Sequence, residues 1–244
     1  MQDYNEAASG DAASIRKYAL LMAGGSGLRA GGDLPKQMQP LLGVPMLIYS
    51  IRAFLEEDAN CRIILVLNDS CREQWLRIAA EYPDAERLII CGGGKDRLQS
   101  VINGLRMIPP GQGRCYVAIH DAARPMLTPE LVRRGWECAL EKGSAVPVVP
   151  EVNSLRYLPS GNISDKDSKA LDRARYYAVQ TPQIFEVESI KNAYSRGLRP
   201  EFTDDASVYE AAGGVINLYE GSPENFKVTN PIDFLLASAV LASR

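Results

Sequence analysis

The sequence lacks the features that mark several common classes of protein. It contains a single histidine, and its five cysteines are scattered without a Cys-x-x-Cys pair, which argues against a zinc ribbon or a disulfide framework and favours a reducing, cytoplasmic setting. Its net charge of −3 is not that of a protein that binds nucleic acid through bulk positive charge. No apolar stretch approaches the roughly 18 residues of a membrane span. We therefore expect neither nucleic acid nor a membrane as a partner.

The composition that remains is that of an ordinary globular protein. Of the 244 residues, 46% are hydrophobic and 23% are charged. Residues 1–16 are rich in Ala, Ser, Asp and Glu and have no apolar core, so we expect a flexible tail there rather than a signal peptide. Residues 17–244 are expected to form one folded domain.

Short apolar strands alternate with amphipathic helices along most of this domain. The predicted strands are at residues 20–22, 63–67, 88–91, 116–119 and 146–149. The predicted helices are at residues 46–57, 71–82, 97–107 and 129–142, and Pro45 is expected at the first position of the first helix. This alternation predicts an α/β, Rossmann-like fold, with a mostly parallel sheet and helices on both faces.

The segment at about 150–176 breaks this rhythm. It is polar, and only residues 154–158 have a strand-like pattern. A polar segment of this length in a compact domain is typical of a projecting arm. The α/β pattern then resumes with a helix at 187–197, a strand at 215–219 and a closing helix that starts at Pro231 and is capped by Asn230.

Glycines and charged residues follow the predicted strands, at the edge where open α/β sheets bind ligands. The segments concerned are residues 23–37, 92–97 with Ser100 on the helix that follows, 120–125 and 225–229. They bring glycine-rich backbone, several cations and one carboxylate, Asp121, to one crevice. Backbone N–H groups and cations bind phosphates, and a carboxylate can hold a divalent metal. The sequence therefore predicts a site for a polyphosphate and a divalent cation.

The first of these loops fits neither of two common phosphate motifs. It has no Gly-Lys-Ser/Thr, which a Walker loop requires. Residues 25–30 match the dinucleotide pattern Gly-x-Gly-x-x-Ala, but Gly31, Gly32 and Pro35 prevent the helix that must begin there. A long loop carrying Arg29 and Lys36 can instead wrap a triphosphate. Such a transfer requires positioning and charge neutralisation rather than a nucleophilic side chain.

Five ordered motifs resemble those of one enzyme family. They are AGGSGLR with LPKQ (23–29 and 34–37), HDAARP (120–125), QTPQ (180–183), TDDAS (203–207) and NFKVT (225–229). Together they are similar to the 2-C-methyl-D-erythritol 4-phosphate cytidylyltransferases of the non-mevalonate isoprenoid pathway, from about Lys17 to the C-terminus. The resemblance implies an enzyme that joins CTP to methylerythritol phosphate with release of pyrophosphate, with Mg²⁺ as cofactor.

The resemblance also implies roles for single residues. The triphosphate would be held by Ala23, Gly24, Gly25, Arg29 and Lys36. The cytosine and ribose end would be lined by Gly94, Ser100 and Ala122. Asp121 would lie nearest the Mg²⁺, and the sugar phosphate would be bound by Arg124, Thr181, Thr203 and Lys227. Arg29, Lys36 and Lys227 would be the catalytic residues.

In this family the segment that corresponds to about 150–176 clasps a second subunit. Arg173 would then enter the active site of the partner and bind the substrate phosphate. The resemblance thus implies a homodimer formed through the arm.

Other interpretations of the same residues stay open. His120 is expected to pack at a strand end rather than act as a base, and Asp121 could cap a turn instead of binding metal. Asp204 and Asp205 look like the start of a helix at 206–212. Two other functions also remain. The first is a ribitol-5-phosphate cytidylyltransferase, against which the Ala122-Ala123 pair argues, and the second is a non-catalytic nucleotide-binding module.

Overall fold

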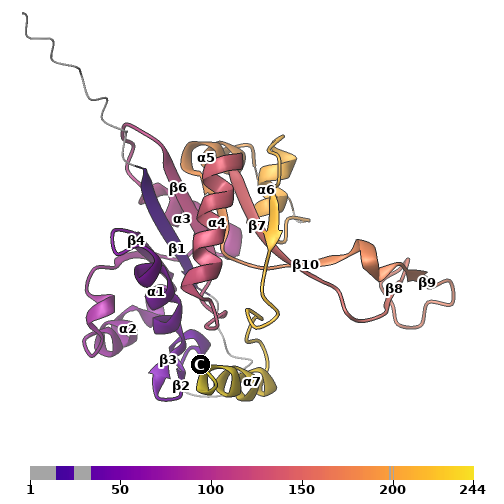
Figure 1. The fold of residues 1–244 in the computed structure, drawn as a ribbon, viewed down its shortest axis with the longest axis horizontal. Coiled ribbons are helices and arrows are strands. Elements are labelled where there is room, and N and C mark those ends of the chain that lie inside the picture. The colour runs from indigo at the N-terminus through magenta and orange to yellow at the C-terminus, as the bar shows by residue number, and fades with distance from the viewer. Residues whose placement is uncertain (1–14, 25–33, 198, 200) are drawn as a thin grey trace, which may run out of the picture.

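A central sheet with helices on both faces forms the body of the protein, and an arm projects from one side (Figure 1). The computed structural model describes residues 15–24, 34–197, 199 and 201–244. The strands of the main sheet are β1 (Arg16–Ala23), β4 (Arg62–Leu67), β5 (Ile89–Gly92), β6 (Cys115–Asp121), β7 (Ser144–Pro150), β10 (Tyr177–Val179), β11 (Gln183–Glu186) and β12 (Leu218–Glu220). The helices are α1 (Met46–Glu57), α2 (Arg72–Ala79), α3 (Arg97–Arg106), α4 (Pro129–Lys142), α5 (Val187–Ser195), α6 (Asp205–Ala211) and α7 (Pro231–Ala242).

The predicted, mostly parallel sheet is confirmed, although two of its strands, β10 and β11, run opposite to the others. Its order is β10-β7-β11-β6-β1-β4-β5, and β12 pairs with β7. Strands β6, β1, β4 and β5 run parallel, whereas β11 is antiparallel to both β6 and β7. Strand β11 was not predicted from the sequence, because only two of its four residues, Ile184 and Phe185, are apolar, which is too short an apolar run.

Alternation along β1 explains why helices are needed on both faces. Ala19 and Leu21 pack into one buried cluster with α1 and α4, whereas Tyr18 and Leu20 pack into a second cluster with α3, α5 and α6. A strand buried on both faces reads as a continuous apolar run, which is what residues 18–22 show.

Local signals fix the ends of several helices. The Asp96 side chain accepts a hydrogen bond from the Gln99 backbone N–H at 2.7 Å and caps α3. Gly143, with φ of 91°, ends α4 in the left-handed conformation that favours glycine. The predicted bounds of the helices at 46–57 and 129–142 are confirmed, but Pro45 is the N-cap of α1 and pairs in a short hairpin rather than opening the helix.

The arm is built on a small hairpin. Its strands are β8 (Leu155–Tyr157) and β9 (Lys169–Leu171), and β10 returns the chain to β7. Figure 1 shows this hairpin lying well away from the main sheet. Large apolar side chains stand exposed along the arm, among them Val152 and Ile163, which are 72% and 94% exposed.

Two further observations concern the ends of the domain. Strand β1 begins at Arg16, one residue before the predicted start of the folded domain, and residues 1–14 of the predicted tail lie outside the described residues. Over the described part of the chain, no helix combines the length and the apolar character that crossing a membrane requires.

Candidate active site

Three of the predicted segments meet at the carboxyl ends of β1 and β6. The Lys36 ammonium donates to the Val228 carbonyl at 2.6 Å, and the Val228 backbone N–H donates to the Ala123 carbonyl at 2.8 Å. Arg124 donates through Nη1 to the Asn225 carbonyl at 2.8 Å. The end of the glycine-rich loop, the segment after β6 and the segment before α7 therefore form one wall, as the sequence analysis expected of segments that follow parallel strands.

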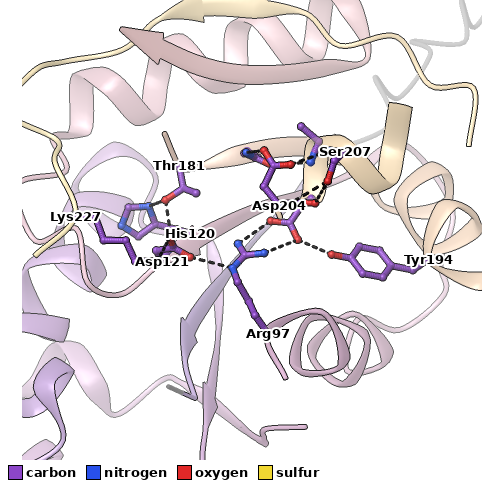
Figure 2. A network of polar contacts seen from close by, with 11 residues as sticks. Arg97, His120, Asp121, Thr181, Tyr194, Asp204, Ser207 and Lys227 are labelled. Carbon is purple, nitrogen blue, oxygen red and sulfur yellow. Dashed lines mark hydrogen bonds and ion pairs between the residues drawn. The ribbon is translucent and has the colours of Figure 1, made fainter. Parts of the chain in front are cut away.

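Asp121 lies at the centre of this wall between two cations. Its Oδ2 is 2.9 Å from the Lys227 Nζ, and its Oδ1 accepts from the Arg97 Nε at 3.1 Å (Figure 2). Burial alone would raise the pKa of Asp121, but the charges of Arg97 and Lys227 outweigh burial and hold the pKa well below its usual range. The carboxylate is therefore ionised at neutral pH.

Arg97 is itself fixed from behind. Its Nη1 and Nη2 donate to the two carboxylate oxygens of Asp205 at 3.1 and 2.8 Å, and the Tyr194 hydroxyl donates to Asp205 Oδ1 at 2.5 Å. The Asp205 side chain is fully buried. No role was predicted from the sequence for Arg97 or Tyr194, and Asp205 was expected only at the start of a helix. Because Arg97 ends the glycine-rich 92–97 segment, its place near the crevice could have been predicted. Its partners could not, because they lie on helices that are distant in the sequence.

Asp204 and Asp205 begin α6, as predicted from the sequence. Asp204 is the N-cap, and its side chain accepts from the Ser207 backbone N–H at 2.9 Å. Asp205 does more than start the helix, because its carboxylate carries the Arg97 contact.

His120 is buried as a packing residue. It is 0% exposed, its Nδ1 is 3.0 Å from the Thr181 Oγ1, and its Nε2 is 3.4 Å from the Ser50 Oγ. Burial lowers its pKa to about 3, so the ring is neutral. Thr181 Oγ1 also accepts from the Asp121 backbone N–H at 3.1 Å, which places this threonine behind Asp121 with its hydroxyl in internal hydrogen bonds.

A second group of predicted residues lies between β1 and the start of α3. The Ser100 Oγ accepts from the Gly94 backbone N–H at 2.9 Å and donates to the Asp96 carbonyl at 2.7 Å. A Cβ on Gly24 would stand 3.5 Å from the same oxygen. Ala23 and Ala122 are buried at the ends of β1 and β6. The predicted nucleotide-binding residues that the structure describes therefore lie together, along the ends of β1 and β6 and the start of α3.

Four predicted site residues remain, and the structure describes two of them. Gly25 and Arg29 lie outside the described residues. Thr203 is exposed just before the N-cap of α6. Arg173 belongs to the arm, where its Nη1 donates to the Val152 carbonyl at 2.6 Å.

The predicted magnesium site contains one carboxylate. Within the described ranges, no group of three or more His, Cys, Asp or Glu side chains is arranged to hold a metal ion. Mg²⁺ is commonly held by one or two carboxylates together with substrate phosphates and water. A carboxylate offers about four lone-pair positions, so Asp121 retains acceptor capacity beyond its two cationic partners. These residues fit a metal that arrives with a phosphate substrate.

Comparisons with known proteins agree with the motifs. The family model of 2-C-methyl-D-erythritol 4-phosphate cytidylyltransferase matches residues 18–243. The protein of that name from Bacteroides thetaiotaomicron is 41% identical over 227 residues, which are 93% of this chain and 100% of the relative. The one from Ralstonia nicotianae is 39% identical over 93% of this chain and 92% of its own.

Solved structures extend the agreement to the fold. The crystal structure of 2-C-methyl-D-erythritol 4-phosphate cytidylyltransferase from Thermus thermophilus matches with a TM-score of 0.73 and 28% identity, covering 93% of this chain and 99% of that one. The enzyme from Francisella tularensis matches with a TM-score of 0.75 and 25% identity over 92% and 99% of the two chains. Sequence and fold together show that the chain belongs to the 2-C-methyl-D-erythritol 4-phosphate cytidylyltransferase family.

Proposed function

We propose that the protein transfers the cytidylyl group of CTP to 2-C-methyl-D-erythritol 4-phosphate and releases pyrophosphate, in the synthesis of isoprenoid precursors. One observation carries the proposal beyond family membership. The Lys227 ammonium stands 2.9 Å from a carboxylate at the carboxyl end of the sheet, and Lys36 and Arg124 are tied to the same wall. Cations in such an arrangement suit two phosphate-bearing substrates.

The bond changes in this reaction need no nucleophile from the protein. A phosphate oxygen of methylerythritol phosphate attacks the α-phosphorus of CTP, a new P–O bond forms, and the bond to the β-phosphate breaks. That oxygen is already ionised near neutral pH, since the second pKa of a phosphate ester is about 6. No general base is required, in agreement with a neutral, buried His120.

The protein's part is then positioning and charge neutralisation. Arg29, Lys36 and Lys227 stabilise the charge that develops at the α-phosphate, with Ala23, Gly24 and Gly25 along the triphosphate. Gly94, Ser100 and Ala122 line the nucleoside end. Arg124, Thr181 and Thr203 form the part of the site that binds methylerythritol phosphate. Thr181 contributes indirectly, through its hydrogen bond to the Asp121 backbone N–H.

A divalent cation, Mg²⁺ by preference, completes the proposed site. Asp121 would hold it beside the phosphates, and when bound it supplies positive charge to the triphosphate and to the leaving pyrophosphate. Lys227 and Arg97 keep Asp121 ionised and oriented for that purpose.

We further propose a homodimer in the cytoplasm. The exposed apolar residues of the arm support a contact with a second copy, in which Arg173 of one subunit would bind the substrate phosphate in the other. All five cysteines are free, which supports a reducing compartment.

Pyrophosphate release tests the function. CTP is supplied with either methylerythritol phosphate or ribitol 5-phosphate, each with and without Mg²⁺. We expect release only with methylerythritol phosphate and Mg²⁺. A preference for ribitol 5-phosphate would support the alternative enzyme, and no release with either polyol would support a non-catalytic module.

A further inference from the structure

A series of part-buried polar contacts leads from the candidate site to the buried pair of Tyr194 and Asp205. In Figure 2 the labelled side chains of Tyr194, Arg97, Asp121 and Lys227 follow one another from right to left. One further carboxylate lies between Tyr194 and Arg97, and dashed lines mark the contacts. That carboxylate is Asp205, which accepts from Tyr194 at 2.5 Å and from both terminal nitrogens of Arg97. These contacts connect α5, α6, α3 and the end of β6.

The geometry of Arg97 explains what this series of contacts can do. A guanidinium has a planar fork of donors, and here two of them are held by Asp205 while Nε points at Asp121 Oδ1 at 3.1 Å. With its fork fixed, Arg97 has one orientation. The Asp121 carboxylate is bonded through that oxygen, so its Oδ2 has a fixed direction toward Lys227.

We propose that Arg97, clamped by Asp205 and Tyr194, is a positioning residue that orients Asp121 and thereby sets the place of the Lys227 ammonium in the crevice. This inference rests on the proposed cytidylyl transfer for its kinetic consequence. Its structural content, a rigid Arg97 Nε–H held by the Tyr194 end of the series, is measurable without turnover.

Tyr194→Phe is the most selective perturbation. It removes one hydroxyl at the end of the series farthest from Lys227. Asp205 Oδ1 keeps the Arg97 Nη1 as a donor at 3.1 Å, so no buried oxygen is left without a partner. Tyr209→Phe is a matched control, because Tyr209 is half-buried on α6 and packs its ring against Phe185 at 4.9 Å.

Hydrogen exchange of the Arg97 Nε–H, followed by ¹⁵N NMR, tests the clamp. We expect exchange to be roughly tenfold faster in Tyr194→Phe, as for the loss of about 1.4 kcal/mol of coupling, and to change less than about twofold in Tyr209→Phe. Equal exchange in the wild type and in Tyr194→Phe would overturn the inference, whatever the enzyme's activity.

A double-mutant cycle tests the link to Lys227. Tyr194→Phe is expected to lower kcat by roughly fivefold with KM for CTP within about twofold, and Lys227→Ala to lower kcat by roughly 10²-fold. In the Lys227→Ala background the Tyr194 substitution should have no further effect, because the group it positions is gone. The same fold-loss in both backgrounds would mean a general structural effect and would contradict the proposal.

Arg97→Lys gives a second variant that keeps the charge and loses the fork. We expect its kcat to fall roughly tenfold or more, again only when Lys227 is present. If the Arg97→Lys protein unfolds in a cooperative thermal transition and keeps the wild-type kcat, the guanidinium has no role in orienting Asp121.

Discussion

Acidification from pH 8 to pH 5 is expected to destabilise the protein by about 2 kcal/mol through one side chain. His120 is the only histidine in the sequence, and burial lowers its pKa from 6.5 to about 3. The unfolded chain therefore binds a proton below about pH 6.5 that the folded protein does not bind until about pH 3, so stability falls as the pH falls through that window. At pH 5 the unfolded histidine is about 1.5 pH units below its pKa, and at about 1.36 kcal/mol per unit this gives the 2 kcal/mol.

Urea unfolding at pH 8, 7, 6 and 5 measures this directly. His120→Gln is the matched variant, because its amide can hydrogen-bond to Ser50 and Thr181 but does not titrate. The variant is expected to be less stable at pH 8 and to lack the histidine part of the pH dependence. If the wild type and the variant lose the same free energy between pH 8 and pH 5, His120 is not the buried neutral group described above.

Four further outcomes follow from the site. Lys36→Ala should lower kcat by roughly 10²-fold, while the lost hydrogen bond to the Val228 carbonyl should cost only about 1–2 kcal/mol of unfolding free energy. Lys142→Ala, at an exposed lysine, is the control. A Lys36→Ala protein that melts early but keeps its kcat would show that Lys36 is structural. Gly94→Ala should raise KM for CTP, because the new Cβ would stand 2.5 Å from the Gln99 Cγ and displace the start of α3; an unchanged KM contradicts this. CTP should be used in preference to UTP and ATP under limiting nucleotide, since a pocket of fixed backbone groups discriminates by size and hydrogen-bonding edge, and equal turnover would refute it. Arg173→Ala and Lys36→Ala should each be nearly inactive, yet subunit exchange between them should restore part of the activity; no recovery after demonstrated exchange would mean that Arg173 does not act in the partner.

The sheet and most helices were predictable because their signals are local. The apolar runs of β1, β4 and β6 are buried on both faces and read as strands without any knowledge of their partners. The helix at 129–142 carries its own start signal, with Thr128 as the N-cap and Pro129 after it, and its own stop at Gly143.

Predictions failed where tertiary contacts decide the structure. Strand β11 has only four residues and is defined by its pairing with β6 and β7 on either side. The predicted strand at 215–219 is observed at Leu218–Glu220, where β12 pairs with β7. Short segments of this kind have weak patterns, so their neighbours determine where they begin and end.

The candidate site divides in the same way. Rules about parallel strands brought together Asp121, Lys36 and Lys227 from their positions after strands. The contacts of Tyr194 and Asp205 behind Arg97 were not predictable. Both residues lie far along the chain from Arg97, on helices whose packing cannot be predicted from sequence patterns.

The most direct test of the proposed reaction is the fate of the α-phosphorus of CTP. The enzyme is incubated with CTP carrying ³²P at the α-position, with Mg²⁺, and with or without methylerythritol phosphate. Cytidylyl transfer predicts that the label appears in a new cytidine diphosphate ester, that unlabelled pyrophosphate accumulates in equal amount, and that neither product forms without the second substrate. Label that stays in CTP, or that appears as CMP at the same rate with and without methylerythritol phosphate, would contradict it.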